Sequence, residues 1–220
     1  MTPVIHVVDD DESFRRSMDR RLRGLGYAVA THPSVERFFE RPDPGAPGCV
    51  LADLQMPGRD GFDLQAALAA SDNPLPVVFV TGKGDIPTSV RAMRAGAEDF
   101  LTKRAGTEEL VAAIDRAIAR DARERAERTR ANVARDKIGL LTDRELQMLL
   151  GIVKGLQNRE MAEIYGLSER TVKYHRTMLT RRLDLYASVD LTRLVQEAGL
   201  SVDDLAAMAS GNMPPRRSGS

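Results

Sequence analysis

The first half of the chain alternates short apolar runs with helical patterns, and this alternation limits the possible folds more than any other feature. Five runs rich in β-branched residues predict strands at residues 4–8, 28–31, 49–52, 77–81 and 99–102. Helical patterns follow them at residues 13–25, 35–40, 61–70, 86–95 and from 107 onward. A strand-helix unit repeated five times predicts a five-stranded parallel sheet with helices on both faces, the doubly wound α/β class.

The second half is expected to be all-helical. Residues 107–138 contain no glycine or proline and are rich in Ala, Arg and Glu, which favours a long helix. Shorter helices are expected at residues 143–154, 159–165, 169–183 and 188–198. A helix-turn-helix pattern is formed by the short helix at 159–165, a turn that contains glycine, and the longer basic helix at 169–183.

Polar residues mark where these shorter helices begin. Thr142 and Glu145 have the spacing of a capping box, and Asn158 and Ser168 are candidate N-caps. We therefore divide the chain into an α/β domain at residues 1–120, a helical linker at 121–137, a helix-turn-helix domain at 138–200 and a C-terminal tail at 201–220.

Composition bears on the compartment. The longest apolar runs are far shorter than the roughly 18 to 20 residues of a membrane-spanning helix. The acidic run that begins at Asp9 interrupts the first apolar stretch before a secretory signal could be complete. Cys49 is the single cysteine, which excludes an intramolecular disulfide and suits a reducing environment. We expect a cytoplasmic protein with no membrane association.

Carboxylates follow two of the predicted strands. Asp9 and Asp10 end the first strand, and Asp53 ends the third. Because ligands of open parallel sheets bind at the carboxyl ends of the strands, these side chains are expected to converge. Crowded carboxylates repel one another unless a cation joins them, and oxygen ligands of this kind favour Mg²⁺.

Two further groups end neighbouring strands. Thr81 offers a hydroxyl after the fourth strand, and Lys103 offers an ammonium after the fifth. A hydroxyl donor, an ammonium and a divalent metal around one carboxylate form a pocket for the oxygens of a phosphoryl group. Asp53 is then the candidate nucleophile, which would form an aspartyl phosphate.

Four segments together resemble the receiver domain of two-component response regulators: VVDDDES, VLADLQMPGRDG, VFVTGKGD and AGAEDFLTK. The resemblance covers residues 3–120. It implies that Asp53 is the phosphoacceptor and that Asp10 is the main metal ligand, assisted by Asp9 and by the carbonyl of Gln55. It also implies that Thr81 and Lys103 bind phosphoryl oxygens.

The same resemblance implies a conformational switch in which the ring of Phe100 follows Thr81 on phosphorylation. The chain departs from the family at Arg104, where receivers usually carry a proline after the lysine. We also expect Lys83, two residues after Thr81, to slow hydrolysis of the phosphate.

The helix expected at residues 169–183 is strongly basic. Residues 168–182 hold five Lys and Arg against one Glu, a density suited to neutralising DNA phosphates. Val172, Met178, Leu179 and Leu183 recur at helical spacing and predict its buried face. The opposite face offers side chains to a DNA groove and to phosphates.

The stretch LTDRELQMLLGIVKGLQNREMAEIYGLSERTVKYHRTMLTRRL resembles the LuxR-type helix-turn-helix of the NarL/FixJ regulators, over residues 140–197. In combination with GKGDIPTSVRAMRAGAEDF, the FixJ branch is the nearest match. The resemblance implies a recognition helix at 169–183, and we name as DNA-binding candidates Arg170, Lys173, Tyr174, His175, Thr177 and Arg181.

These features predict a DNA-binding transcription regulator controlled by phosphorylation rather than a turnover enzyme. The resemblance implies a sensor histidine kinase as phosphodonor, Mg²⁺ as cofactor, promoter DNA and RNA polymerase as partners, and a homodimer on phosphorylation. Three alternatives remain: a DNA-binding pseudo-receiver that needs no phosphate, a Mg²⁺ phosphohydrolase, and an adaptor without DNA binding. The phosphohydrolase would need an acid-base residue two places after Asp53, and Gln55 cannot serve as one.

Overall fold

The computed structural model describes residues 1–41, 45–82 and 85–210, so Lys83 lies outside the described residues. The chain forms two compact units that meet within one helix, between Arg125 and Ala126. No helix of the described residues is long and apolar enough to span a membrane.

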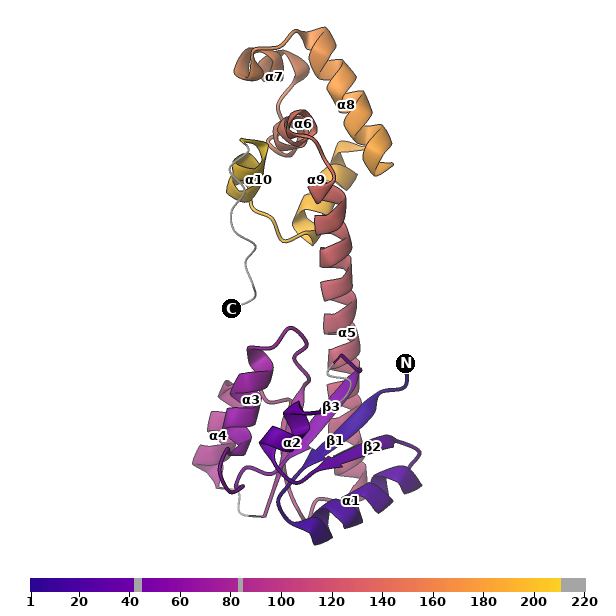
Figure 1. Ribbon diagram of the computed structural model, residues 1–220, viewed down its shortest axis with the longest axis vertical. Helices are drawn as coiled ribbons and strands as arrows, with labels where there is room; N and C mark the ends of the chain where they lie inside the picture. The colour runs from indigo at the N-terminus through magenta and orange to yellow at the C-terminus, as the bar shows by residue number, and fades with distance from the viewer. Residues whose placement is uncertain (42–44, 83–84, 211–220) are drawn as a thin grey trace. The chain divides into compact units, whose positions relative to one another are not determined.

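The first unit is built on a five-stranded sheet (Figure 1). Its strands are β1 Val4–Val8, β2 Ala28–His32, β3 Gly48–Ala52, β4 Val77–Thr81 and β5 Asp99–Thr102. They lie in the order β2-β1-β3-β4-β5, and every pairing is parallel. The predicted doubly wound α/β fold is confirmed, and β1 and β3 are neighbours at its centre.

Five helices cover the two faces of this sheet (Figure 1). They are α1 Glu12–Gly24, α2 Val35–Phe39, α3 Gly61–Ala69, α4 Ile86–Arg94 and α5 Thr107–Gly139. Met18 of α1 and Ile114 of α5 share one apolar cluster, whereas Phe38, Leu64 and Ala92 of α2, α3 and α4 share the other. Burial of apolar side chains on both faces explains the unbroken apolar runs of the central strands.

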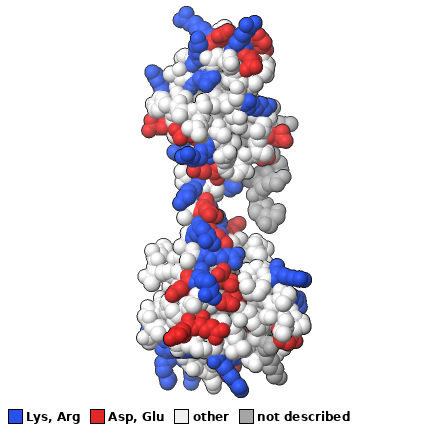
Figure 2. Space-filling view, turned by 180° about the vertical axis from the view of Figure 1, so that it is seen from behind, with Lys and Arg blue, Asp and Glu red and all other residues white. Residues whose placement is uncertain are grey.

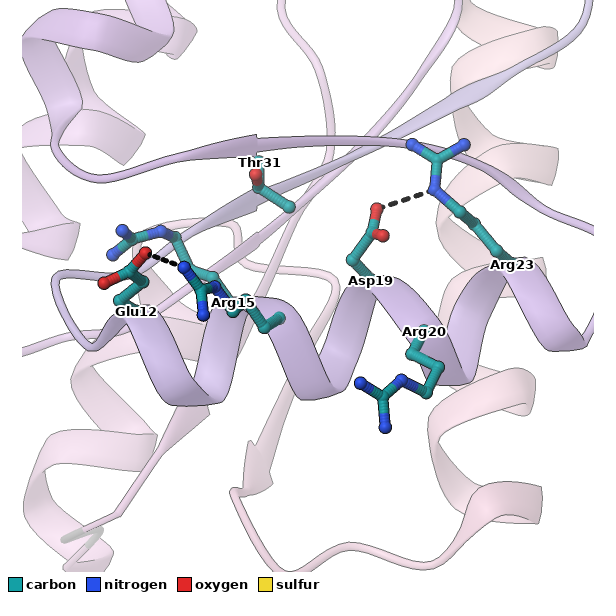
Figure 3. A pocket seen from close by; sticks show the side chains of 7 residues that line it. Glu12, Arg15, Asp19, Arg20, Arg23 and Thr31 are labelled. Atoms are coloured by element: carbon teal, nitrogen blue, oxygen red, sulfur yellow. Dashed lines mark hydrogen bonds and ion pairs between the residues drawn. The ribbon is translucent and has the colours of Figure 1, made fainter.

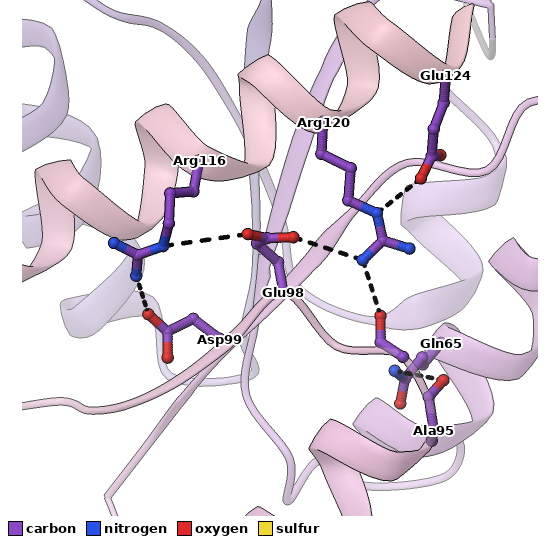
Figure 4. Close-up of polar contacts among 8 residues, drawn as sticks. Gln65, Ala95, Glu98, Asp99, Arg116, Arg120 and Glu124 are labelled. Carbon is purple, nitrogen blue, oxygen red and sulfur yellow. Dashed lines mark hydrogen bonds and ion pairs between the residues drawn. The ribbon is translucent and has the colours of Figure 1, made fainter. Parts of the chain in front are cut away.

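Ion pairs hold α5 against β5 and the loop before it. Arg116 pairs with Asp99, and Arg120 lies 3.4 Å from Glu98 and 2.7 Å from Glu124 (Figure 4). Figure 2 shows such oppositely charged side chains alternating on the exposed surface of the first unit. Exposed pairs of this kind contribute little individually, roughly 0 to 1 kcal/mol, so they fix the orientation of the helix more than its stability.

A buried carboxylate anchors the middle of α5. Asp121 is 1% exposed and accepts hydrogen bonds from the backbone of Gly48 at 2.9 Å and from Arg125 at 2.8 Å. Arg125 also donates to the carbonyls of Gly45 and Ala46. A Cβ at Gly48 would lie 1.9 Å from the carbonyl oxygen of Val4, so the strand entry requires glycine. Asp121 therefore belongs to the first unit, although the sequence placed it at the start of a separate linker.

The second unit is all-helical, as predicted. It contains the C-terminal part of α5 and the helices α6 Asp143–Val153, α7 Asn158–Tyr165, α8 Glu169–Leu183, α9 Ser188–Glu197 and α10 Val202–Ala209. Ala134 and Ile138 of α5 are buried in its core with residues of all the other helices. The proposed linker is thus a part of α5, and the last turns of α5 belong to the core of the second unit.

The end of the chain differs from the expected tail. Residues 202–209 form α10, which a capping box between Ser201 and Asp204 begins. Leu205 is fully buried in the core of the second unit, and α10 packs against α6. At eight residues the segment is too short for a clear periodic signal, which is why the sequence pattern missed the helix.

Two histidines are buried together on the sheet. His6 of β1 and His32 of β2 place Nδ1 and Nε2 3.1 Å apart, and Phe38 packs edge-on against both rings. Burial, then the charges of His32 and Arg41, lower the pKa of His6 from 6.5 to about 4. The folded state therefore favours neutral His6, while the unfolded chain takes up a proton below pH 6.5.

This histidine pair predicts acid sensitivity. Stability should fall as the pH drops from 6.5 toward 4, by roughly 1 to 3 kcal/mol for His6. In His6→Gln this pH dependence should become shallower. Urea denaturation followed by reagent access to buried Cys49 measures it within the first unit. His175→Gln, in the second unit, is the control, and equal pH slopes for His6→Gln and the parent would contradict the assignment.

Candidate functional site

Three carboxylates meet at the carboxyl end of the sheet, as the sequence predicts. Asp9 follows β1 and is fully buried, Asp53 follows the neighbouring β3 and is 7% exposed, and Asp10 is exposed. The backbone N–H of Asp53 donates to the carbonyl of Val8 at 2.9 Å, which ties the two strand ends together. One oxygen from each carboxylate lies within 4.8 Å of those of the other two.

Lys103 joins two of these carboxylates. Its Nζ lies 2.7 Å from Oδ2 of Asp9 and 2.7 Å from Oδ2 of Asp53. The backbone N–H of Lys103 donates to the carbonyl of Thr81, so β4 brings the lysine to the site. Burial acts to lower the pKa of Lys103, but the hydrogen bonds and charges of Asp53 and Asp9 outweigh it and raise the pKa. The lysine is therefore cationic at neutral pH.

The surroundings of Asp9 suit a hard cation. Burial raises the pKa of Asp9, although hydrogen bonds from Lys103 and from the backbone of Asp11 oppose this effect. Its Oδ2 is buried and pairs with the Lys103 ammonium at 2.7 Å. A buried carboxylate oxygen in this state, beside two further carboxylates, is the kind of donor set that Mg²⁺ takes.

Gln55 and Gly61 border Asp53. The backbone N–H of Gln55 donates to Oδ1 of Asp53 at 3.3 Å, and its side chain is exposed. At Gly61, which begins α3, a Cβ would lie 2.5 Å from the carbonyl oxygen of Asp53. Glycine thus lets α3 begin against the Asp53 loop. The sequence analysis did not single out Gly61, because only the fold reveals this close approach.

Thr81 and Phe100 point to the same face of the sheet. Phe79 and Phe100 are paired across β4 and β5, and Thr81 lies two residues beyond Phe79. Thr81 is 1% exposed, whereas Phe100 is half-buried with its ring 6.5 Å from that of Phe79. The two candidate switch residues therefore sit on adjacent strands next to Lys103. Arg104 is exposed, and the described residues contain no cis peptide bond.

The second candidate site is the helix pair α7 and α8. Gly166 ends α7 in the left-handed conformation at φ 63°, which glycine adopts without strain. The side chain of Ser168 then accepts from the backbone of Thr171 and caps α8, as predicted. This turn sets the two helices as a helix-turn-helix.

α8 has a buried face and an exposed face. Val172, Leu179 and Leu183 are buried in the core, as their spacing predicts, whereas Met178, predicted for the same face, is only half-buried. Tyr174 is 60% exposed, and His175 is half-buried beside it at 5.3 Å between ring centroids. The remaining DNA-binding candidates are all exposed: Arg170, Lys173, Thr177 and Arg181.

Two other arginines of α8 hold the domain together. Arg176 donates to Oδ1 of Asn158 at 2.6 Å, and Arg182 lies 3.1 Å from Glu145 and donates to the carbonyl of Leu140. The interpretation of Asn158 as an N-cap is wrong: it is the first helical residue of α7, and Gln157 precedes it as the cap. Its side chain is engaged by Arg176 instead. The charge of α8 therefore overstates how many cations face outward.

Two family models match the chain. One, described as "Response regulator receiver domain", matches residues 5–115. The other, described as "Bacterial regulatory proteins, luxR family", matches residues 139–195. These ranges contain the carboxylate site and the helix-turn-helix, respectively.

Whole proteins show the same combination. Nodulation protein W of Bradyrhizobium diazoefficiens is 35% identical over 201 residues, 91% of this chain and 88% of that protein. Transcriptional regulatory protein FixJ of the same species is 35% identical over 202 residues, 90% of this chain and 97% of that protein. A solved structure of the response regulator StyR has a TM-score of 0.77 and 37% identity, and the match covers 90% of this chain and 100% of that one.

Proposed function

Because this chain belongs to the response regulators that join a receiver domain to a LuxR-type DNA-binding domain, we propose that Asp53 is the phosphoacceptor and that α8 is the DNA-recognition helix. The chain is a phosphorylation-controlled DNA-binding transcription regulator. The observation that supports Asp53 as its reactive residue is the pair of 2.7 Å contacts from Lys103 to Asp53 and Asp9.

The proposed reaction is transfer of one phosphoryl group. An oxygen of the Asp53 carboxylate attacks the phosphorus of a phosphohistidine on a sensor kinase. The new O–P bond forms as the P–N bond breaks, and the histidine nitrogen keeps the electron pair and takes up a proton. Lys103 stays beside the carboxylate during this step and offsets the charge that the phosphoryl group brings.

The acidic residues have a separate part in this proposal. Mg²⁺ would be held by Asp9, Asp10, Asp53 and the carbonyl of Gln55, and when bound it supplies positive charge to the phosphoryl oxygens. Asp9 is held in place for this role because its Oδ1 accepts from the backbone of Asp11 at 2.9 Å. We assign Thr81 and Lys103 to the phosphoryl oxygens.

We further assign Thr81 and Phe100 to the switch. Both side chains belong to the same face of the sheet, and Phe100 is only partly buried, so its ring can move inward into the space that the hydroxyl of Thr81 leaves when it turns toward phosphate. This change would alter the surface of α4, where Ile86 is 80% exposed and Val90 and Met93 are also exposed. Exposed apolar side chains on one helix support the proposed homodimer of the phosphorylated protein.

At promoter DNA, the exposed face of α8 would enter the major groove. Lys173, Tyr174 and Thr177 are proposed to contact base edges, while Arg170, His175 and Arg181 contact phosphates. We also propose RNA polymerase as a further partner of this output and the cytoplasm as its compartment, because a regulator of promoters needs access to DNA. Beyond its own phosphorylation and dephosphorylation we assign it no enzymatic turnover.

Asp53→Asn should abolish phosphorylation by acetyl phosphate in the presence of Mg²⁺, because the amide lacks the nucleophilic oxygen. Intact-protein and peptide mass spectrometry measure the phosphoryl group. Asp72→Asn, at an exposed carboxylate, is the control and should be phosphorylated like the parent. A parent protein that gains no mass would favour the phosphate-independent pseudo-receiver, and steady turnover of phosphate esters would favour the phosphohydrolase.

Asp10→Asn and Asp53→Asn should each weaken Mg²⁺ binding by about tenfold or more, because each removes a charged oxygen ligand. Isothermal titration calorimetry with MgCl₂ measures the dissociation constant, and Asp72→Asn again serves as the control. Unchanged Mg²⁺ affinity in both variants would show that the metal does not bind at this site.

Variants of α8 should separate base contacts from phosphate contacts. Arg181→Ala should reduce the slope of log K against log salt by about 0.9 without changing sequence preference. Lys173→Ala should relax preference at one base position, by roughly 1 to 3 kcal/mol. Fluorescence anisotropy with a sequence selected from a random pool measures both. Arg193→Gln, on α9, is the control. Loss of DNA affinity in this variant but not in the α8 variants would contradict the assignment of α8 as the recognition helix.

A further inference from the structure

We propose that α1 positions Lys103 for phosphoryl transfer, through the ring of Phe14 and the guanidinium of Arg21. This inference rests on the proposed function of Asp53 and Lys103, and it assigns two positioning residues to the same site. Neither side chain touches the carboxylates in the contacts described above. Phe14 contacts the ammonium of Lys103, and Arg21 contacts the loop that carries the lysine.

Phe14 borders the ammonium directly. Nζ of Lys103 lies 4.4 Å from the centroid of the Phe14 ring, over its face. An ammonium has three N–H donors, and those of Lys103 have two carboxylate oxygens as partners at 2.7 Å. The ring face lies beside the same ammonium and attracts it electrostatically. Phe14 is half-buried in the cluster formed by α1 and α5, so its position is fixed by packing.

Arg21 holds the other end of the same loop. Its guanidinium donates to the carbonyl of Ala105 at 3.2 Å and to the hydroxyl of Thr107 at 3.0 Å. Ala105 lies in the loop between β5 and α5, two residues after Lys103, and Thr107 is the first residue of α5. Phe14 and Arg21 are seven positions apart on α1, about two turns, so one face of the helix reaches both ends of the loop.

The loop needs such contacts. Its sequence from residue 103 to 106 is Lys-Arg-Ala-Gly, which contains a glycine and no proline. No proline ring restricts the backbone of this loop, and its glycine adds conformational freedom. The side chain of Arg104 is exposed and contributes no described hydrogen bond. The backbone N–H of Lys103 ties the start of the loop to the carbonyl of Thr81, and the contacts from α1 add the side-chain restraint that orients Lys103 toward the two carboxylates.

α1 also reaches the acidic side of the pocket. Arg15 donates from Nη1 to the carbonyl of Asp9 at 2.6 Å. One helix thus contacts the backbone of Asp9 and the loop of Lys103, the two partners of a single ion pair. The other arginines of this helix face an open groove beside Thr31, where Arg16 pairs with Glu12 and Arg23 with Asp19 (Figure 3).

The test compares Phe14→Leu, which keeps apolar packing and removes the ring, with Phe14→Tyr, which keeps the ring. Arg21→Gln tests the second contact. Arg20→Gln is the control, because Arg20 is exposed and, among the described residues, has neither an ion pair nor a hydrogen bond. All four are made in the full chain, and urea denaturation followed at Cys49 confirms that each variant is folded.

Two readouts are used. The first is the maximal rate of phosphorylation by acetyl phosphate with Mg²⁺, in which the Asp53 oxygen forms the O–P bond and acetate leaves with its electron pair. We expect Phe14→Leu and Arg21→Gln to be slower by about three- to tenfold, and Phe14→Tyr and Arg20→Gln to match the parent. The second is reductive methylation of Lys103 without phosphodonor, quantified by peptide mass spectrometry, which should be faster in the two slow variants.

The outcomes separate this inference from the proposed function. If the parent is phosphorylated and Phe14→Leu matches it in both readouts, α1 does not position Lys103. If Phe14→Tyr is as slow as Phe14→Leu, the ring is not the cause, and the inference is wrong for Phe14. If the parent takes no phosphate, the proposed function fails, while the methylation rates still show whether α1 holds the lysine. If Phe14→Leu does not fold, Arg21→Gln still tests whether α1 positions Lys103.

Discussion

The ammonium of Lys103 between two carboxylates is the interaction on which the receiver depends. Asp9 is fully buried and Asp53 nearly so, and two anions this close in a low-dielectric crevice would repel each other strongly without a cation. Because the strands are parallel, the carboxyl ends of β1, β3, β4 and β5 lie at one edge of the sheet. Charged residues about 50 positions apart in the chain therefore neutralise one another there. A phosphoryl group added to Asp53 changes that balance. In the proposed switch, this local change acts through the hydroxyl of Thr81, the half-buried ring of Phe100 and the exposed apolar side chains of α4.

Much of this could be predicted because it depends on local patterns. Short apolar runs that alternate with helical patterns predicted the sheet, and the rule that ligands bind at the carboxyl ends of the strands then brought together Asp9, Asp53, Thr81 and Lys103. Capping residues and the spacing of Val172, Leu179 and Leu183 predicted the helix-turn-helix and its buried face.

What the sequence could not predict depends on partners far apart in the chain. Arg21 reaches Ala105, Asp121 reaches Gly48 and Arg176 reaches Asn158, and no local spacing encodes these hydrogen bonds. For the same reason the sequence did not show that Arg176 and Arg182 bind Asn158 and Glu145, or that His6 is buried beside His32.

Helix α5 is the element in which the sequence-based division was least accurate. Its apolar residues thin out after Ile118, which led to the prediction of a linker between two domains. The structure has a single helix of 33 residues whose first turns supply Leu110 and Ile114 to the receiver core and whose last turns supply Ala134 and Ile138 to the helical core. Sparse apolar residues in its middle therefore mark the change from one core to the other, with the helical hydrogen bonds continuing through it. Buried Asp121, held by Arg125 and Gly48, ends the part that belongs to the receiver.

The central claim is that charge gained at Asp53 alters how α8 engages DNA. Its most direct test is the dissociation constant of the full-length protein for a sequence selected from a random pool, measured at fixed salt before and after treatment with acetyl phosphate and Mg²⁺. The account predicts tighter binding by the treated protein, in proportion to the fraction phosphorylated at Asp53, and no change in Asp53→Asn. Equal affinities for fully phosphorylated and untreated protein would contradict it.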